Sequence, residues 1–238
     1  MRGKGLTAPT TILAAALAVT ACARATPTTP PTTEGVLAKA REAMNAVQSY
    51  RIRGEIIGDT DLGTQEARYS AEFAAPGRTY QRFEGVGEAE GQVTELIAVD
   101  GRLFVRESSY QGGEWRERSV TGLQVTSGLP RDLDSPRLLA DETVNGVSAF
   151  HVVAEHDPEQ SETLPGTATL SATYHLFISQ LDYRLVRLVT ETAAHYTETT
   201  TVGGTPVVRE VQQRSTITYD YYDYDQPVTI EVPEVNGR

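Results

Sequence analysis

Few residues in this 238-residue chain are of a type that performs chemistry. The chain has one cysteine, Cys22, and four histidines, His151, His156, His175 and His195. No two histidines have the spacing of a zinc-binding pair such as His-Glu-x-x-His, although His151 and His175 fall in predicted strands and could meet across a sheet. Scattered histidines are typical of polar surface or core positions. We therefore expect neither a metal site nor a catalytic histidine.

The carboxylates cluster at two places without completing a recognised site. Residues 220–225, Asp-Tyr-Tyr-Asp-Tyr-Asp, lack the glycine-turned loop that a calcium site uses. Residues 59–63 resemble part of a calcium loop but lack the distal glutamate, which favours a turn. No serine lies in a G-x-S-x-G motif, and the many Asp and Glu residues neither support nor exclude a glycosidase pair. The prediction is a non-enzymatic protein without a cofactor.

The lone cysteine has a more specific explanation, since it cannot form an internal disulfide. Arg2 and Lys4 precede an apolar run over residues 12–19, which is too short to span a bilayer as a helix. Residues 19–22, Val-Thr-Ala-Cys, then match a bacterial lipobox: small residues give the peptidase access, and the sulfur carries diacylglycerol. This pattern predicts a lipoprotein signal peptide over residues 1–21 and lipidation of Cys22. The alternative is a soluble secreted protein with a chance cysteine.

The residues that follow Cys22 suit a tether. Residues 22–34 are rich in Thr and Pro, which favours extended backbone with little to bury. Without residues 1–21 the chain has 19 basic and 32 acidic residues, a net charge of −13. This acidity argues against nucleic-acid binding and against electrostatic docking to anionic lipid. Membrane contact would come through the acyl anchor on Cys22.

Hydrophobic periodicity predicts one long helix followed by a sheet. Residues 36–48 carry apolar side chains at helical spacing. Alternating segments then predict about ten strands, with Asp100-Gly101 as the strongest hairpin signal. The predicted strands cover residues 50–56, 67–73, 78–84, 95–99, 102–106, 114–118, 148–155, 167–178, 183–192, 207–221 and 228–232. Ser135-Pro136 resembles a helix N-cap and first turn, which predicts a short helix over residues 136–141.

Four segments in this order resemble the LolA/LolB-like superfamily, and within it the LppX/LprG-type lipoproteins of actinobacteria. They are VLAKAREAMNAVQSYRIRGEI (36–56), TVNGVSAFHVVAE (143–155), YHLFISQLDYRLVRL (174–188) and STITYDYYDYDQPVTIEVP (215–233). With the lipobox, the likeness covers most of residues 12–233. The chain departs from the group's pattern at Gln180, where an acidic residue is usual, and in long loops over residues 85–91 and 194–207.

The resemblance implies an α+β fold over residues 35–238, a curved antiparallel half-barrel sheet wrapped over a few helices. In these families an apolar cavity between sheet and helices holds acyl chains. An apolar hollow stays dry until hydrocarbon fills it. The inward candidates are the apolar phases of the predicted strands, each of which could equally be plain core: Ile52, Ile56, Tyr69, Phe73, Leu96, Val153, Leu170, Tyr174, Leu176 and Ile178.

The sequence leaves three functions open. The first is an envelope lipoprotein on the extracytoplasmic face of the cell membrane that carries or presents an acylated lipid or lipoglycan. The second is a sensor or interaction module that binds an envelope protein partner, resembling the anti-sigma-factor regulators that share the LolA-like fold. The third is a structural lipoprotein whose hollow is filled by side chains. The first requires a large apolar void, the second requires a partner domain, and the third predicts a closed core.

Overall fold

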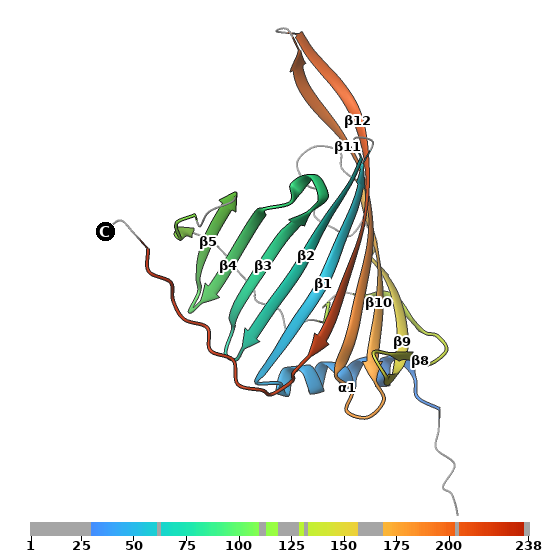
Figure 1. Ribbon diagram of the computed structural model, residues 1–238. Coiled ribbons are helices and arrows are strands. Elements are labelled where there is room, and N and C mark those ends of the chain that lie inside the picture. Colours follow the sequence, from blue (N-terminus) through green and yellow to red (C-terminus); the bar gives the residue numbers. More distant parts are fainter. Residues whose placement is uncertain are drawn as a thin grey trace, which may run out of the picture. The chain divides into compact units, whose positions relative to one another are not determined.

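Alternating apolar and polar residues shape most of the described part of the chain into one open, curved antiparallel sheet of twelve strands (Figure 1). The structure is a computed structural model and describes residues 30–60, 63–109, 113–118, 129–130, 133–156, 169–202 and 205–235. The residues from Pro31 onwards belong to one structural unit. Cys22 and the predicted signal peptide lie outside the described residues.

The helix α1 (Thr33–Ala46) opens the described part of the chain. The Thr32 hydroxyl accepts a hydrogen bond from the Gly35 amide at 3.1 Å and so caps the first turn. Val36, Ala40 and Met44 form part of a buried stripe, which confirms the predicted amphipathic helix. The helix begins three residues earlier than predicted, so the last two residues of the expected tether are helical.

The first half of the sheet is a meander in which each strand pairs with the next. Asp100 and Gly101 both have positive φ, 53° and 76°, as a two-residue hairpin turn between β4 and β5 requires. The strands are β1 (Ser49–Thr60), β2 (Gly63–Ala74), β3 (Arg78–Val86), β4 (Gln92–Val99), β5 (Arg102–Ser109) and β6 (Arg116–Arg118), with the 3-10 helix η1 (Gly87–Ala89) between β3 and β4.

The second half of the sheet joins the first half through β12, its last strand in the sequence. Its strands are β7 (Asp134–Leu138), β8 (Glu142–Val144), β9 (Val147–His156), β10 (Thr169–Ser179), β11 (Leu185–Val202) and β12 (Thr205–Tyr222). β12 pairs with β1, so the strand order is β6-β5-β4-β3-β2-β1-β12-β11-β10-β9-β7, with β8 also on β9. The first and last strands of the chain therefore meet in the middle of the sheet.

Two parts of the predicted fold class need correction. The sheet has twelve strands rather than about ten, and the described residues contain one α-helix rather than a few. The predicted short helix over residues 136–141 is wrong, because these residues begin in β7. β7 is an edge strand with a bulge between Asp134 and Arg137, and such a place tolerates Pro136 without a donor for the ladder. Ser135 has a φ of 45°, which no helix N-cap uses.

Two other segments also differ from the prediction. Residues 228–232 form no strand, and Ile230 is buried against Phe104 and its neighbours. Residues 194–202 and 205–207, expected as part of a loop, continue β11 and β12 instead, and Figure 1 shows this pair of strands extending beyond the others. The threonine-rich sequence there lacks an apolar phase, so alternation gives no signal.

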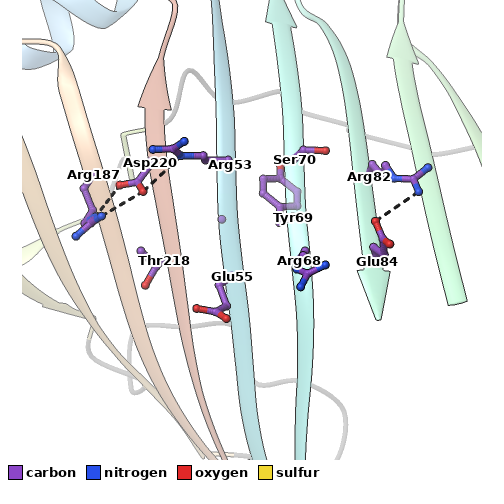
Figure 2. Close-up of a pocket in the computed structure, with 11 residues that line it drawn as sticks. Arg53, Glu55, Arg68, Tyr69, Ser70, Arg82, Glu84, Arg187, Thr218 and Asp220 are labelled. Atoms are coloured by element: carbon purple, nitrogen blue, oxygen red, sulfur yellow. Dashed lines mark hydrogen bonds and ion pairs between the residues drawn. The ribbon is translucent and has the colours of Figure 1, made fainter. Parts of the chain in front are cut away.

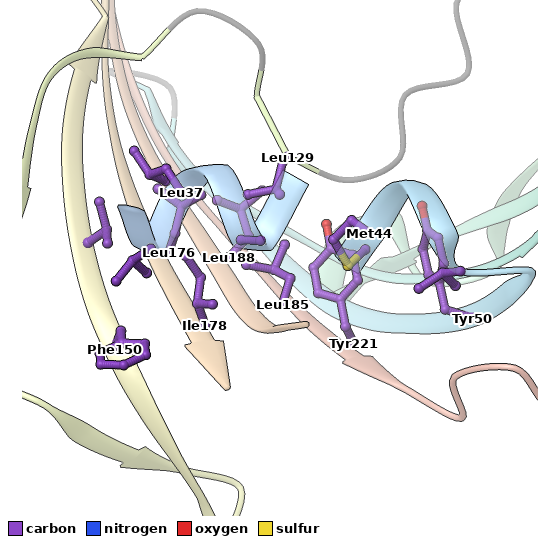
Figure 3. Close-up of a cluster of buried hydrophobic side chains, with 14 residues drawn as sticks. Leu37, Met44, Tyr50, Leu129, Phe150, Leu176, Ile178, Leu185, Leu188 and Tyr221 are labelled. Atoms are coloured by element: carbon purple, nitrogen blue, oxygen red, sulfur yellow. The ribbon is translucent and has the colours of Figure 1, made fainter. Parts of the chain in front are cut away.

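The two faces of the sheet carry different clusters of buried hydrophobic side chains. The helix face carries Leu176, Leu188 and Tyr221, which pack against α1 (Figure 3). The opposite face, which we call the arginine face, buries Phe104 with Ile230 at one side and Phe177 with Val186 at the other. None of the helical residues that the structure describes forms a segment with the length and apolarity that a bilayer crossing requires.

Candidate functional site: an apolar strip and an arginine groove

The residues predicted to line a cavity divide into three groups. Leu176 and Ile178 are fully buried in the cluster under α1, where Ile52, Phe73 and Tyr174 pack against them. These five therefore take part in the core beneath the helix.

Ile56, Tyr69 and Leu96 form the second group, on the same face but outside that cluster. Strand pairing places them beside other half-buried apolar residues. Phe83 pairs with Tyr69, Val105 pairs with Leu96, and Ile217 pairs with Ile56. We call these six residues, Ile56, Tyr69, Phe83, Leu96, Val105 and Ile217, the apolar strip. It crosses β12 and the first five strands without belonging to the core under α1.

Val153 and Leu170 are the remaining two predicted residues. Val153 lies on the arginine face, since it pairs with His175 while its neighbour Val152 pairs with Leu176 under α1. The side chain of Leu170 is not among those that the structure describes. β9 is buried on both faces, so its run of apolar residues does not reveal which side each one takes.

Aromatic rings give the apolar strip its shape. The Tyr69 ring lies 4.9 Å from that of Phe83 and 5.0 Å from that of Tyr219, measured between centroids. Gly54 separates Tyr69 and Tyr219 along the pairing direction and has no side chain to keep the rings apart. Burial raises the pKa of the Tyr69 phenol and that of the Tyr219 phenol, so both stay neutral at physiological pH.

The arginine face contains a groove of about 620 Å³, shown in Figure 2. It is lined by Arg53, Gly54, Glu55, Arg68, Tyr69, Ser70, Arg82, Glu84, Arg187, Thr218 and Asp220. Gly54 and Tyr69 point to the helix face by alternation, so they present backbone to the groove. The groove and the apolar strip therefore occupy opposite faces of the same strands.

Charged residues of the groove continue beyond it, and together they form a row across the sheet. Directly paired positions run from β11 to β5 in the order Arg187, Asp220, Arg53, Ser70, Arg82, Glu95, Arg106. Arg187 donates to Asp220 from Nε at 2.7 Å, and Arg106 Nε donates to Glu95 at 2.6 Å. The row was not among the predicted sites, because only the register of the strands aligns these residues.

The two acids of this row are held in their charged forms. Burial raises the pKa of Asp220, but hydrogen bonds from Arg187 and Asn145 outweigh it and leave the pKa below its ordinary value. Burial likewise raises the pKa of Glu95, while hydrogen bonds from Tyr80 and Arg106 lower it further than burial raises it. Both carboxylates thus remain ionised as partners of arginines.

His151, His175 and the three aspartates within residues 220–225 have structural partners. His151 Nε2 lies 3.1 Å from His175 Nδ1, so the two histidines do meet, and Glu142 lies 2.7 Å from His151 Nδ1. No group of three or more metal-ligating residues occurs within the described part of the chain. Of the three aspartates raised as calcium donors, Asp220 pairs with Arg187, Asp223 with Arg51 and Asp225 with Arg184.

Comparison with known proteins finds likeness in structure only. No protein-family model and no curated protein matches this chain. Lipoprotein LppX of Mycobacterium tuberculosis aligns over 84% of this chain and 100% of its own, at 12% identity and a TM-score of 0.47. LprF of Mycobacterium bovis aligns over 85% and 98%, at 13% identity and a TM-score of 0.45. The LolA superfamily protein NE2245 of Nitrosomonas europaea aligns over 84% and 95%, at 14% identity and a TM-score of 0.34.

Proposed function

We propose that this protein is a lipoprotein of the bacterial cell envelope that binds an acyl chain of a lipid or lipoglycan along its apolar strip. One observation carries the proposal. Ile56, Tyr69, Phe83 and their strip neighbours are apolar and face the same side as the core under α1, yet they are only half-buried. A hydrocarbon chain would complete their burial.

The energetics suit exchange of a lipid between two apolar sites. Each buried CH₂ contributes roughly 0.8 kcal/mol relative to water, so an acyl chain prefers the strip to solvent. A bilayer offers the chain the same gain, so transfer between membrane and protein is close to balanced. Such a balance allows a carrier to load and unload without an energy source. No enzymatic step and no cofactor enter the proposal.

Anchoring belongs to the same proposal. Acylation of Cys22 would hold the protein on the extracytoplasmic face of the membrane, with the Thr- and Pro-rich residues before α1 as spacer. Two acyl chains anchor a protein stably, whereas one gives only marginal binding. The folded unit from Pro31 onwards would then work within reach of the lipid surface.

The test is extraction and uptake. Residues 23–238 are expressed in a lipid-containing host and purified without detergent, and solvent extracts are analysed by mass spectrometry. A stoichiometric acylated species supports the proposal and identifies its class. A protein that is empty and also fails to take up a fluorescent fatty acid would contradict it, and would favour a module that binds an envelope protein partner.

Two adjacent isoleucines provide a matched pair of variants. Ile56 belongs to the apolar strip, and Ile57 is a half-buried neighbour on the arginine face of the same strand. Asparagine would place a polar group at a half-buried position of β1 in either variant, and its side chain is too short to extend along the sheet into water. The two substitutions are therefore matched in chemistry and in backbone conformation. We expect Ile56→Asn to abolish fatty-acid uptake and Ile57→Asn to preserve it. Equal loss in both folded variants would argue against the strip.

A further inference from the structure

The charged row on the arginine face leaves positive charge at its centre. Its two acids are engaged mainly by the outer arginines, Arg187 on Asp220 and Arg106 on Glu95. The inner pair, Arg53 and Arg82, lies on either side of Ser70 in directly paired positions.

The inner arginines hold only loose contacts with these acids. Arg53 approaches Asp220 at 3.9 Å and has a side chain that is 68% exposed. Arg82 approaches Glu95 at 3.7 Å and Glu84 at 3.5 Å. A guanidinium has five donors in a fixed fork, so both groups keep donors for a further acceptor. The space between them lies over Ser70 in the groove of Figure 2.

Arg68 adds a third cation beside this space. It lies two positions before Ser70 on β2, on the same face, with Glu55 and Glu84 at the paired positions of the neighbouring strands. The backbone of Arg68 belongs to the sheet, but its guanidinium makes no hydrogen bond or ion pair with any residue that the structure describes. Within the described residues, an exposed cation with no side-chain partner thus lies next to two arginines with spare donors, although the chain as a whole has a net charge of −11.

We propose that the groove binds a phosphate-type oxyanion, held over the Ser70 hydroxyl by the guanidinium groups of Arg53, Arg68 and Arg82. Arginine suits this role because its planar fork matches two phosphate oxygens at once. Glu55 and Glu84 at the rim limit the excess charge and disfavour ligands with extended negative charge. The site is independent of the acyl-binding proposal, since it lies on the opposite face of the strands.

The phosphate group could belong to a free molecule or to a phospholipid headgroup, and two measurements distinguish them. Inorganic phosphate is titrated into residues 23–238 by calorimetry. Separately, the protein is sedimented with phosphatidylcholine vesicles, with and without phosphatidylglycerol. Phosphate binding supports the site with a free ligand. Binding only to the vesicles that contain phosphatidylglycerol supports it with a headgroup, provided that the variants below abolish it.

The variants locate the site. We expect Arg53→Gln and Arg68→Gln each to weaken binding about tenfold, the loss expected for a charged hydrogen bond. Arg214→Gln is the control, because Arg214 is an exposed arginine of the same face that does not line the groove. A loss of the same size in all three variants, or no binding of either probe, overturns the proposal.

Ser70→Asp tests the same site without removing a cation. A carboxylate at position 70 would take the place of the bound anion between Arg53 and Arg82. We expect this variant to unfold at a higher temperature than the unaltered protein and to lose phosphate binding. Undiminished binding in a folded Ser70→Asp protein would contradict a site over Ser70.

Discussion

The rings of Tyr69 and Tyr219 meet over Gly54, with centroids 5.0 Å apart and planes at 63°. The glycine is essential to this contact. A Cβ at position 54 would lie 2.3 Å from the Thr218 carbonyl oxygen and 3.0 Å from Tyr219 Cδ1. The contact therefore depends on the backbone of β1 passing close beneath both rings.

We expect Gly54→Ala to lower the free energy of unfolding by about 1–3 kcal/mol, as overpacking of a tight site does. Gly58→Ala on the same strand is the matched control, because its Cβ would meet no atom closer than 4.0 Å. Alanine there is expected to be neutral or slightly stabilising. Denaturant unfolding of both variants measures the difference, and equal effects would show that Gly54 is not held tightly.

The core under α1 gives a second prediction. Ile178 is fully buried there, whereas Leu181, three residues later, is 92% exposed. Ile178→Ala should cost about 2–5 kcal/mol through lost burial and a residual cavity. Leu181→Ala should change stability by less than about 0.5 kcal/mol. Chemical denaturation of both variants measures these changes in the free energy of unfolding. A small loss in Ile178→Ala would mean that the surrounding side chains move to fill the cavity.

We expect low pH to weaken the ion pairs that Glu95 and Asp220 make in the charged row. The folded pKa values of Glu95 and Asp220 are lowered, so their ion pairs stabilise the protein above the unfolded values of 4.5 and 3.8. This contribution is lost as the pH falls below about 4.5 and through the folded values. Stability measured by denaturant should therefore drop steeply below that pH.

The variant Glu95→Gln isolates one carboxylate of this row. At neutral pH it should cost about 1–3 kcal/mol, because Arg106, Arg82 and Tyr80 lose a charged acceptor. The difference from the unaltered protein should narrow as the pH falls below 4.5. Glu66→Gln, at an exposed position of β2, is the control for removing one charge. A difference that stays constant with pH would contradict the assignment.

We expect high pH to lower the stability of the fold, because its buried tyrosines would have to ionise. Burial raises the pKa of Tyr50, Tyr221 and Tyr224 above the ordinary value of 10.0. Above pH 10 the unfolded chain loses these protons while the folded chain keeps them, so stability falls as the pH rises. We expect tyrosinate absorbance to rise in two stages, the later one together with loss of the sheet signal in circular dichroism. A single early stage in a folded protein would contradict their burial.

The membrane anchor rests on one atom and can be tested directly. In a bacterial host that processes lipoproteins, the unaltered chain should partition into the detergent phase and incorporate labelled fatty acid. Cys22→Ala should abolish both, since no other cysteine can carry the lipid. The folded unit should keep its circular dichroism spectrum. Acylation that persists in Cys22→Ala would exclude the lipobox assignment.

Local signals in the sequence predicted the local elements well. The buried stripe of Val36, Ala40 and Met44 has helical spacing, and Asp100-Gly101 has the chemistry of a tight hairpin. β7 was missed because Ser135-Pro136 has the composition of a helix start, while a bulged edge strand accepts the same residues. The outer parts of β11 and β12, residues 194–202 and 205–207, were missed because their threonine-rich sequence has no alternation of apolar and polar residues.

The arginine groove depends on information that no local pattern contains. Arg53 and Ser70 are neighbours through a short hairpin, but Asp220 joins them only when β12 pairs with β1. A shift of one residue in that pairing would turn every side chain of one strand to the other face. Val153 illustrates the same point, because both faces of β9 are buried and alternation cannot assign its side.

The pairing of β12 with β1 also sets when this protein can fold. The hydroxyl of Ser49 and the carbonyl of Gln226, 177 positions apart, are joined by a hydrogen bond at the base of this pair. A chain that leaves the ribosome or crosses a membrane from its N-terminus exposes the edge of β1 until almost all of its length has emerged. Such distant closure makes folding slow. We therefore expect chains truncated within β12 to be degraded or to aggregate. The yield of folded protein should depend on how long the unpaired edge of β1 is kept from pairing with other chains.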